Sequence, residues 1–154
     1  MKFLFLLYFI IHIAYANEPH KSSVVPYELS IKELVNIQNS AILYGSGEKM
    51  VHVFLDPLCP YSRKFLATIA NSKNMLEKYS YAIYLYSIPR LHSQKSVAAV
   101  YDSSQPLNTL LDIMLQDAKL ESEPSVTTQK TVHSIAEVAR HLHVNKRPFL
   151  LVQE

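Results

Sequence analysis

A single cysteine, Cys59, is the residue of this chain best suited to covalent chemistry. It opens the segment Cys59-Pro60-Tyr61-Ser62, between a run of strand-forming residues and a run with helical spacing. The first N–H groups of a helix lack main-chain partners and carry partial positive charge, so they stabilise a thiolate. Ser62 follows about one helical turn later, where its hydroxyl can donate to that thiolate. The sequence therefore predicts a reactive, solvent-open thiol at Cys59.

A cysteine packed in the core is the alternative, because free cysteines are often buried. Two features favour the reactive interpretation. Pro57 and Pro60 flank the cysteine, which is typical of a loop, and the basic pair Arg63-Lys64 follows it. Asp56 has two candidate roles, as a buried proton acceptor near the thiol or as the carboxylate that holds a turn.

The residues on either side of the cysteine predict a strand before it and a helix after it. Residues 50–55 are rich in strand formers and read as a buried central strand. Pro60 suits the first helical position, since its ring fixes φ and it has no N–H, and we expect a helix over 60–72. Residues 41–44 predict a short strand, and the turn signal at 45–48 leads us to expect that the two strands pair as a hairpin.

The rest of the chain predicts further elements in alternation. A second strand is expected at 81–87 and a last one at 149–152. Three helices are expected in between, with a loop at 121–128; they lie at about 94–101, 107–120 and 132–143. Residues 17–27 read as a polar linker, and residues 29–37 are compatible with either a helix or a strand. This order predicts an α/β sandwich.

The first residues have the layout of a secretory signal peptide. A short positive start is followed by an apolar run over 3–15 and a small-x-small cleavage pattern that ends at Ala16. A membrane anchor is the alternative, but a spanning helix needs about 20 apolar residues and polar residues stop this run early. We therefore expect residues 1–16 to be removed, the protein to be periplasmic or secreted, and no stable membrane insertion afterwards.

The segment 53–63, Val-Phe-Leu-Asp-Pro-Leu-Cys-Pro-Tyr-Ser-Arg, resembles the active-site segment of periplasmic disulfide isomerases of the DsbC/DsbG type. In that family a strand ends in Asp and Cys-x-x-Cys follows. The resemblance continues at 44–50, 86–90 and 144–150, and covers most of the chain after the signal peptide. It implies a thioredoxin-like domain over 41–154, with a helical insertion at about 90–143 and a linker segment at 17–40 before it.

The resemblance also implies the layout of a site. Pro148 would be cis and would face Cys59, with a trans proline opening an edge strand as the alternative. The main chain of Arg147 would pair with an extended client peptide, and its guanidinium would approach the thiolate. Pro60 and Tyr61, within the motif, would contact the client.

Three departures from the family change what the resemblance implies. Ser62 replaces the second cysteine of the motif. The chain stops at Glu154, where the family continues with a strand and a helix, so we expect a sheet that is shortened at its C-terminal side. The family's dimerisation domain has no counterpart before residue 40. An open sheet edge needs cover, and a partner chain is one candidate.

A lone thiol limits the chemistry. Without a second cysteine the protein cannot store an oxidising equivalent as an internal disulfide, which excludes a self-contained dithiol oxidase or reductase. Isomerisation or capture of a client cysteine through a mixed disulfide remains open, with exported proteins that contain cysteines as partners and a client thiol, a small thiol or a redox partner to resolve the adduct. The alternatives are a peptide-binding module without redox activity and a product without activity.

The composition excludes other function classes. The formal net charge is +2 and the basic residues are spread along the sequence, which gives no indication of a nucleic-acid partner. The histidines have no metal-ligand spacing and no second cysteine supports a metal site, so we expect neither a metal nor another cofactor.

Overall fold

A computed structural model describes residues 25–152 of the chain. The predicted signal peptide, at 1–16, lies outside the described residues. The helices and strands, together with two short 3₁₀ turns at Gln38–Ser40 and Pro89–Leu91, are as follows: α2 (Tyr27–Val35), β1 (Ile42–Tyr44), β2 (Lys49–Leu55), α3 (Pro60–Ala70), α4 (Lys73–Lys78), β3 (Tyr79–Leu85), α5 (Gln94–Tyr101), α6 (Pro106–Leu115), α7 (Val126–His141) and β4 (Phe149–Val152). None of the helices between residues 25 and 152 combines the length and apolar character that a membrane span requires.

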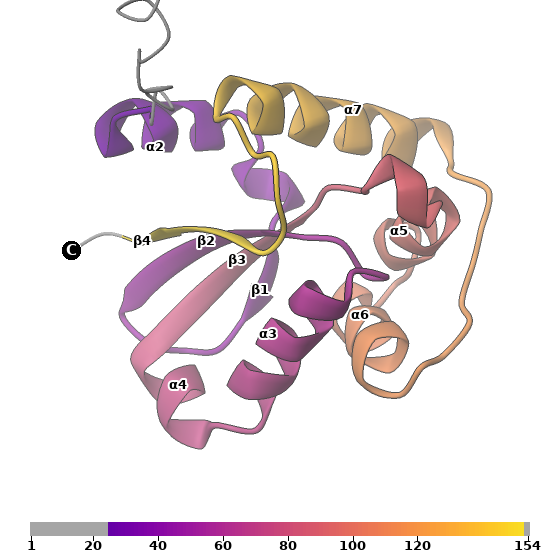
Figure 1. Cartoon of the computed structure of the whole chain (residues 1–154), viewed down its shortest axis with the longest axis horizontal. Helices are drawn as coiled ribbons and strands as arrows, with labels where there is room; N and C mark the ends of the chain where they lie inside the picture. Colours follow the sequence, from indigo (N-terminus) through magenta and orange to yellow (C-terminus); the bar gives the residue numbers. More distant parts are fainter. Residues whose placement is uncertain (1–24, 153–154) are drawn as a thin grey trace, which may run out of the picture.

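The four strands of the sheet lie in the order β1-β3-β2-β4. β3 is antiparallel to β1 and parallel to β2, and β4 is antiparallel to β2. The predicted hairpin between β1 and β2 is therefore wrong, because β3 lies between these strands (Figure 1). The predicted strands themselves are confirmed, with shifts of one or two residues at their ends.

The turn between β1 and β2 explains the error, because it passes across the start of β3 instead of joining two neighbours. Ser46 N donates to Leu76 O at 2.8 Å, and Gly47 N donates to Tyr79 O at 3.3 Å. A Cβ on Gly47 would overlap main-chain atoms of Lys78 and Tyr79, and Gly45 has a φ of 92°. Only glycine fits both positions without strain.

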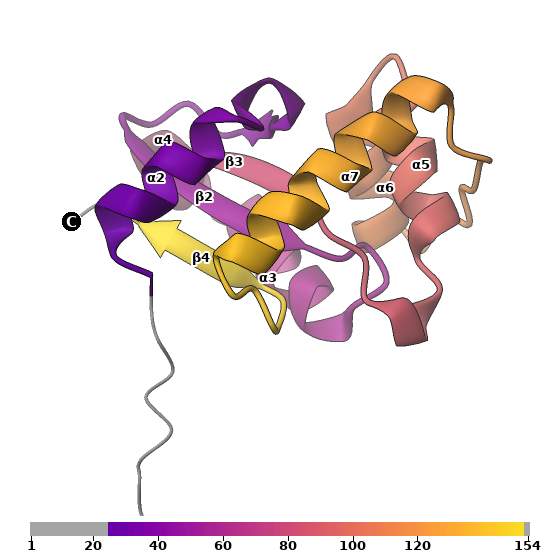
Figure 2. The same cartoon turned by 90° about the horizontal axis from the view of Figure 1, so that it is seen from above.

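Helices cover both faces of the sheet (Figures 1 and 2). α2 and α7 pack on one face, where Leu34, Phe54, Tyr84 and Ile135 belong to one buried apolar cluster. On the other face, α3, α5 and α6 enclose a second cluster with the side chains of alternate strand residues; its members include Val53, Leu55, Leu66, Ile83, Val97, Leu110 and Ile113. Successive residues of a strand point to opposite faces, so Phe54 and Leu55 serve different clusters.

The predicted helices are confirmed as elements, with differences at their ends. α5 has the expected bounds, whereas α6 ends at Leu115 and α7 begins six residues earlier than expected, at Val126. α7 begins there because the Ser125 hydroxyl accepts a hydrogen bond from Thr128 N. α4 was not expected; Ser72 caps it in the same way. The helix α2 decides between helix and strand for residues 29–37 and packs Leu34 into the core, so part of the predicted linker belongs to the folded domain.

Candidate functional site

Cys59 lies where the sequence places it, between the carboxyl end of β2 and the start of α3. It is the residue that precedes the helix, and Pro60 is the first helical residue. Its N–H donates to Asp56 O at 3.1 Å, which closes a tight turn after the strand, and its carbonyl accepts the first helical hydrogen bond, from Arg63 N, at 3.0 Å. The sulfur therefore stands at the amino terminus of an eleven-residue helix.

The expectation that the sulfur is open to solvent is wrong, because Cys59 is only 5% exposed. The loop before β4 covers it: Sγ lies 3.8 Å from the main-chain oxygen of Arg147, at hydrogen-bond distance for a thiol donor. Cys59 nevertheless belongs to neither of the two apolar clusters. The thiol is thus buried beneath the loop before β4 and belongs to neither of the two apolar clusters.

The peptide bond between Arg147 and Pro148 is cis, which confirms the expectation and excludes the trans alternative. The guanidinium of Arg147, which was expected to approach the thiolate, binds elsewhere. Its Nε donates to Tyr86 O at 3.0 Å and its Nη2 donates to Ser87 O at 3.2 Å, while the guanidinium carbon lies 3.9 Å from the centre of the Tyr86 ring. The carbonyls that follow β3 attract the side chain away from the sulfur, so the main chain of Arg147, not its charge, faces Cys59.

Asp56 holds a turn, which is one of its two candidate roles. It is completely buried, and Oδ1 accepts a hydrogen bond from Leu58 N at 2.8 Å. Its Oδ2 accepts hydrogen bonds from Ile88 N and from the Ser93 hydroxyl, the latter at 2.7 Å. These bonds use both carboxylate oxygens and join the loop after β2 to the loop after β3.

Ser62 is also completely buried, and its Oγ accepts a hydrogen bond from Asp56 N at 3.2 Å. In the part of the chain that the structure describes, no hydrogen bond joins Ser62 to the sulfur of Cys59, so the expected donation to the thiolate is not seen. Pro60 and Tyr61 are exposed beside the thiol, Tyr61 by 73%, and are accessible to a client.

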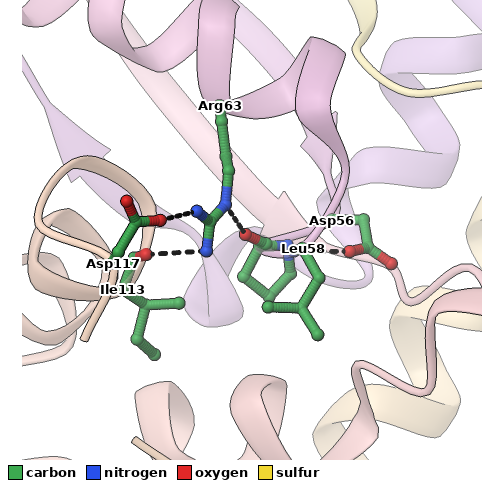
Figure 3. A network of polar contacts seen from close by, with 6 residues as sticks. Asp56, Leu58, Arg63, Ile113 and Asp117 are labelled. Carbon is green, nitrogen blue, oxygen red and sulfur yellow. Dashed lines mark hydrogen bonds and ion pairs between the residues drawn. The ribbon is translucent and has the colours of Figure 1, made fainter. Parts of the chain in front are cut away.

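Arg63, one of the basic pair after the motif, connects α3 to α6 and does not face the thiol. Its Nε donates to Pro57 O at 2.9 Å, and its Nη2 donates to Ile113 O at 2.9 Å. Its Nη1 pairs with Asp117 (Figure 3). Figure 3 shows this guanidinium between the turn that Asp56 holds and the end of α6. Three polar side chains, Asp56, Arg63 and Arg147, therefore fix the loops that surround the cysteine.

Sequence analysis did not identify the residues that bind the side chains of Asp56 and Arg147. Ser93, which donates to Asp56, gives no signal in the sequence, because a serine in a loop is common. Tyr86, which stacks on Arg147, lies in the segment 86–90 that was singled out by resemblance, but its contact with the proline loop joins positions 61 residues apart. Between residues 25 and 152, no three side chains of His, Cys, Asp and Glu are grouped as a metal site requires.

No family model matches the chain, and no curated protein matches it in sequence. Solved structures are similar in fold. A disulfide interchange protein from Neisseria gonorrhoeae is 18% identical, with 73% of this chain and 79% of that chain covered and a TM-score of 0.60. ScsC from Proteus mirabilis, in a transitional conformation, is 14% identical, with coverages of 97% and 79% and a TM-score of 0.68. A periplasmic thioredoxin-like protein from Salmonella enterica serovar Typhimurium is 14% identical, with coverages of 80% and 83% and a TM-score of 0.61. The chain has a thioredoxin-like fold.

Proposed function

We propose that the protein is a monothiol thiol–disulfide exchange factor for exported proteins, with Cys59 as its nucleophile. The observation that carries the proposal is the placement of the sulfur at the amino terminus of α3, against the cis-proline loop and outside both apolar clusters. The N–H groups of the first helical turn are available to a thiolate at this position. The similar structures include one described as a disulfide interchange protein, which supports the same class of chemistry.

The exchange needs no reagent beyond the client. The Cys59 thiolate attacks one sulfur of a client disulfide, the client S–S bond breaks, and the other client sulfur leaves with the electron pair and takes a proton from water. A second thiol of the client, or a small thiol, then attacks the mixed disulfide and releases Cys59. Because the chain contains one cysteine, this second step depends on a thiol from another molecule, and the mixed disulfide lasts until one arrives.

The proline loop also suggests how a client is received. An extended peptide that pairs with the main chain of Arg147 needs its carbonyl as an acceptor, and this carbonyl is the one that now accepts from the thiol. Docking of the client therefore competes with the contact that covers the sulfur. In this proposal Pro148 shapes the docking loop, Pro60 and Tyr61 contact the client, and Ser62 and Asp56 support the turn that presents the thiol.

We further propose that residues 1–16 direct export and are removed, and that the protein acts in the periplasm or as a secreted protein. In this proposal the thioredoxin-like domain spans 41–154 with its helical insertion at about 90–143, and α2, from the segment before it, packs onto that domain. A periplasmic protein of similar fold supports this location.

A binding module without redox activity is the second candidate, and the 5% exposure of Cys59 favours it. In that case the surface beside Pro148 binds a peptide, and Cys59 takes no part in chemistry. The two candidates differ in whether Cys59 forms covalent adducts with clients.

The test is a search for mixed disulfides in the cell that makes the protein. The full chain and its Cys59→Ala variant are produced at equal levels, free thiols are blocked by alkylation at the moment of lysis, and the proteins are compared on gels with and without reductant. Exchange predicts adducts that reductant removes and that the variant lacks. If adducts are absent while both proteins retain the same clients non-covalently, the redox function is refuted and the binding module is supported.

A further inference from the structure

Three segments of the chain that meet around Cys59 contain almost no acidic residues. The segments 56–64, 86–95 and 143–149 have one, Asp56, which is buried and bonded. The lysines and arginines in the same three segments are Arg63, Lys64, Arg90, Lys95, Lys146 and Arg147. The three segments together carry a formal net charge of 6 − 1 = +5, whereas the whole chain has +2, so the remainder of the chain sums to −3.

The contacts of the site hold these three segments next to one another. Asp56 joins the loop after β2 to residues 88 and 93, and Arg147 joins residues 86 and 87 to the sulfur. Six of the 15 lysines and arginines are spread along the sequence but lie in segments that the fold brings to one end of the sheet. This is why composition alone gave no indication of a charged surface.

Two of the six basic side chains are neutralised by ion pairs, Arg63 with Asp117 and Lys95 with Glu123. Among the described residues, the other four form no ion pair with an acidic side chain; they are Lys64, Arg90, Lys146 and Arg147. The first three are exposed, and Arg147 is half-buried against Tyr86. A guanidinium has five N–H donors, so the carbonyl bonds of Arg147 leave donors for a carboxylate.

We propose that the site selects client segments with acidic side chains beside the cysteine that Cys59 attacks. This inference rests on the proposed exchange function and specifies its substrate class. The four basic side chains come from three segments: the first turns of α3, the turn after β3 and the loop before β4. A peptide that extends across these segments meets more of them than a small thiol does. Charge complementarity between the peptide and the site raises the rate at which they associate. Added salt screens the charges and reduces this effect.

The experiment measures how fast Cys59 reacts with activated peptides. Three peptides of equal length carry one cysteine as a 2-thiopyridyl disulfide, flanked by glutamates, glutamines or lysines. Attack by the Cys59 thiolate forms the protein–peptide disulfide and breaks the peptide's S–S bond, and 2-thiopyridone leaves with the electron pair. Its absorbance gives the second-order rate constant. The full chain is compared with Lys146→Gln, Arg90→Gln and, as the matched control, Lys49→Gln, which removes an exposed charge at the opposite end of β2.

At low ionic strength we expect the glutamate peptide to react about tenfold faster than the lysine peptide. Added salt should reduce this preference for the glutamate peptide, and so should each of the variants Lys146→Gln and Arg90→Gln. The control Lys49→Gln should leave the preference unchanged. Equal rates for the three peptides overturn the acidic-client inference and leave the exchange function standing. If no peptide reacts with the folded protein although the unfolded protein reacts with all of them, the exchange function is overturned, and this inference with it.

Discussion

At the amino ends of β2 and β3 the chain is held by main-chain packing, whereas at their carboxyl ends it is held by charged side chains. The turn at 45–48 crosses the start of β3 through two main-chain hydrogen bonds and two glycines. The loops around Cys59 depend on Asp56, Arg63 and Arg147, which bind main-chain groups of distant segments. The turn at 45–48 therefore depends on two positions without a side chain. The loops around Cys59 depend instead on side-chain hydrogen bonds, which substitutions can remove one at a time.

The largest effect is expected at the glycine end. Gly47→Ala places a methyl group on main-chain atoms of Lys78 and Tyr79, where α4 meets β3, and these atoms cannot move without disturbing the sheet. We expect the free energy of unfolding to fall by about 3 kcal/mol or more, measured by urea titration. Ser46→Ala, between the two glycines, keeps the main-chain bond to Leu76 and should change it by less than about 0.5 kcal/mol. Equal stabilities for the two variants would show that the lack of a side chain at residue 47 does not determine how the turn at 45–48 packs.

Asp56→Ala should produce the largest effect at the thiol end. It leaves two N–H groups and the hydroxyl of Ser93 without their acceptor, and we expect a loss of about 3 kcal/mol. The loops after β2 and β3 should also separate, so iodoacetamide should label Cys59 faster under native conditions. Asp112→Ala, an exposed acidic residue on α6, serves as the control for loss of a carboxylate. A stability loss without faster labelling would mean that Asp56 does not govern access to the sulfur.

Arg63→Gln should have an intermediate effect. The shorter amide cannot reach Pro57 O, Ile113 O and Asp117 together, and the guanidinium is only partly exposed. We expect a loss of about 1.5 kcal/mol in urea titration, mainly from the bonds to the two carbonyls. Lys64→Gln, the adjacent and exposed position, should be close to neutral. If both variants behave alike, α6 is attached to the site by apolar packing and not by this arginine.

Arg147→Lys keeps the charge but loses the paired donors and the ring contact with Tyr86. We expect a small loss of stability, about 1 kcal/mol, together with faster alkylation of Cys59, since the covering loop is less well held. An unchanged alkylation rate would show that the carbonyl of Arg147 stays over the sulfur without help from its side chain.

The smallest effect is expected in the pH dependence of stability. It should distinguish a substitution that removes a hydrogen-bonded carboxylate, Asp102→Asn, from one that only adds a steric clash, Gly47→Ala. Hydrogen bonds from Thr128 and then Ser125 hold the pKa of Asp102 below its usual 3.8 and attach the start of α7 to the end of α5. A carboxyl group whose pKa is lowered by folding stabilises the fold at any pH above its pKa in the unfolded state. This stabilisation is lost as the pH falls through its pKa in the folded state. Asp102→Asn should therefore lower the urea midpoint at pH 7, and the difference from the unmodified chain should shrink below about pH 4. The Gly47→Ala difference, by contrast, involves no titrating group and should persist; a constant Asp102→Asn difference would contradict the assignment.

Local patterns predicted most of the elements, and long-range contacts explain the errors. The strand before Cys59, the helix after it and the helix at 94–101 follow from residue types that are adjacent in the sequence. The order of the sheet does not, because glycines at 45 and 47 signal a turn equally well for a hairpin and for a crossing over a third strand. The position of Cys59 at a helix start was predictable from Pro60, but its cover was not, since it depends on a carbonyl 88 residues away.

The candidate site shows the same limit in its charged residues. The sequence predicted Asp56 and Arg147 beside Cys59, where the structure has them, but it left the partners of their side chains open. A guanidinium binds carbonyls, carboxylates and aromatic rings, and Tyr86 offers both its main-chain carbonyl and its ring to Arg147. Residue type alone therefore cannot decide whether Arg147 turns toward the sulfur or toward the end of β3.

Because two apolar clusters and no disulfide hold the fold together, its stability does not depend on an oxidised bridge of its own. In the proposed function, a mild reductant therefore releases a client from the mixed disulfide at Cys59 and leaves the domain folded. The same molecule can then take part in a further exchange.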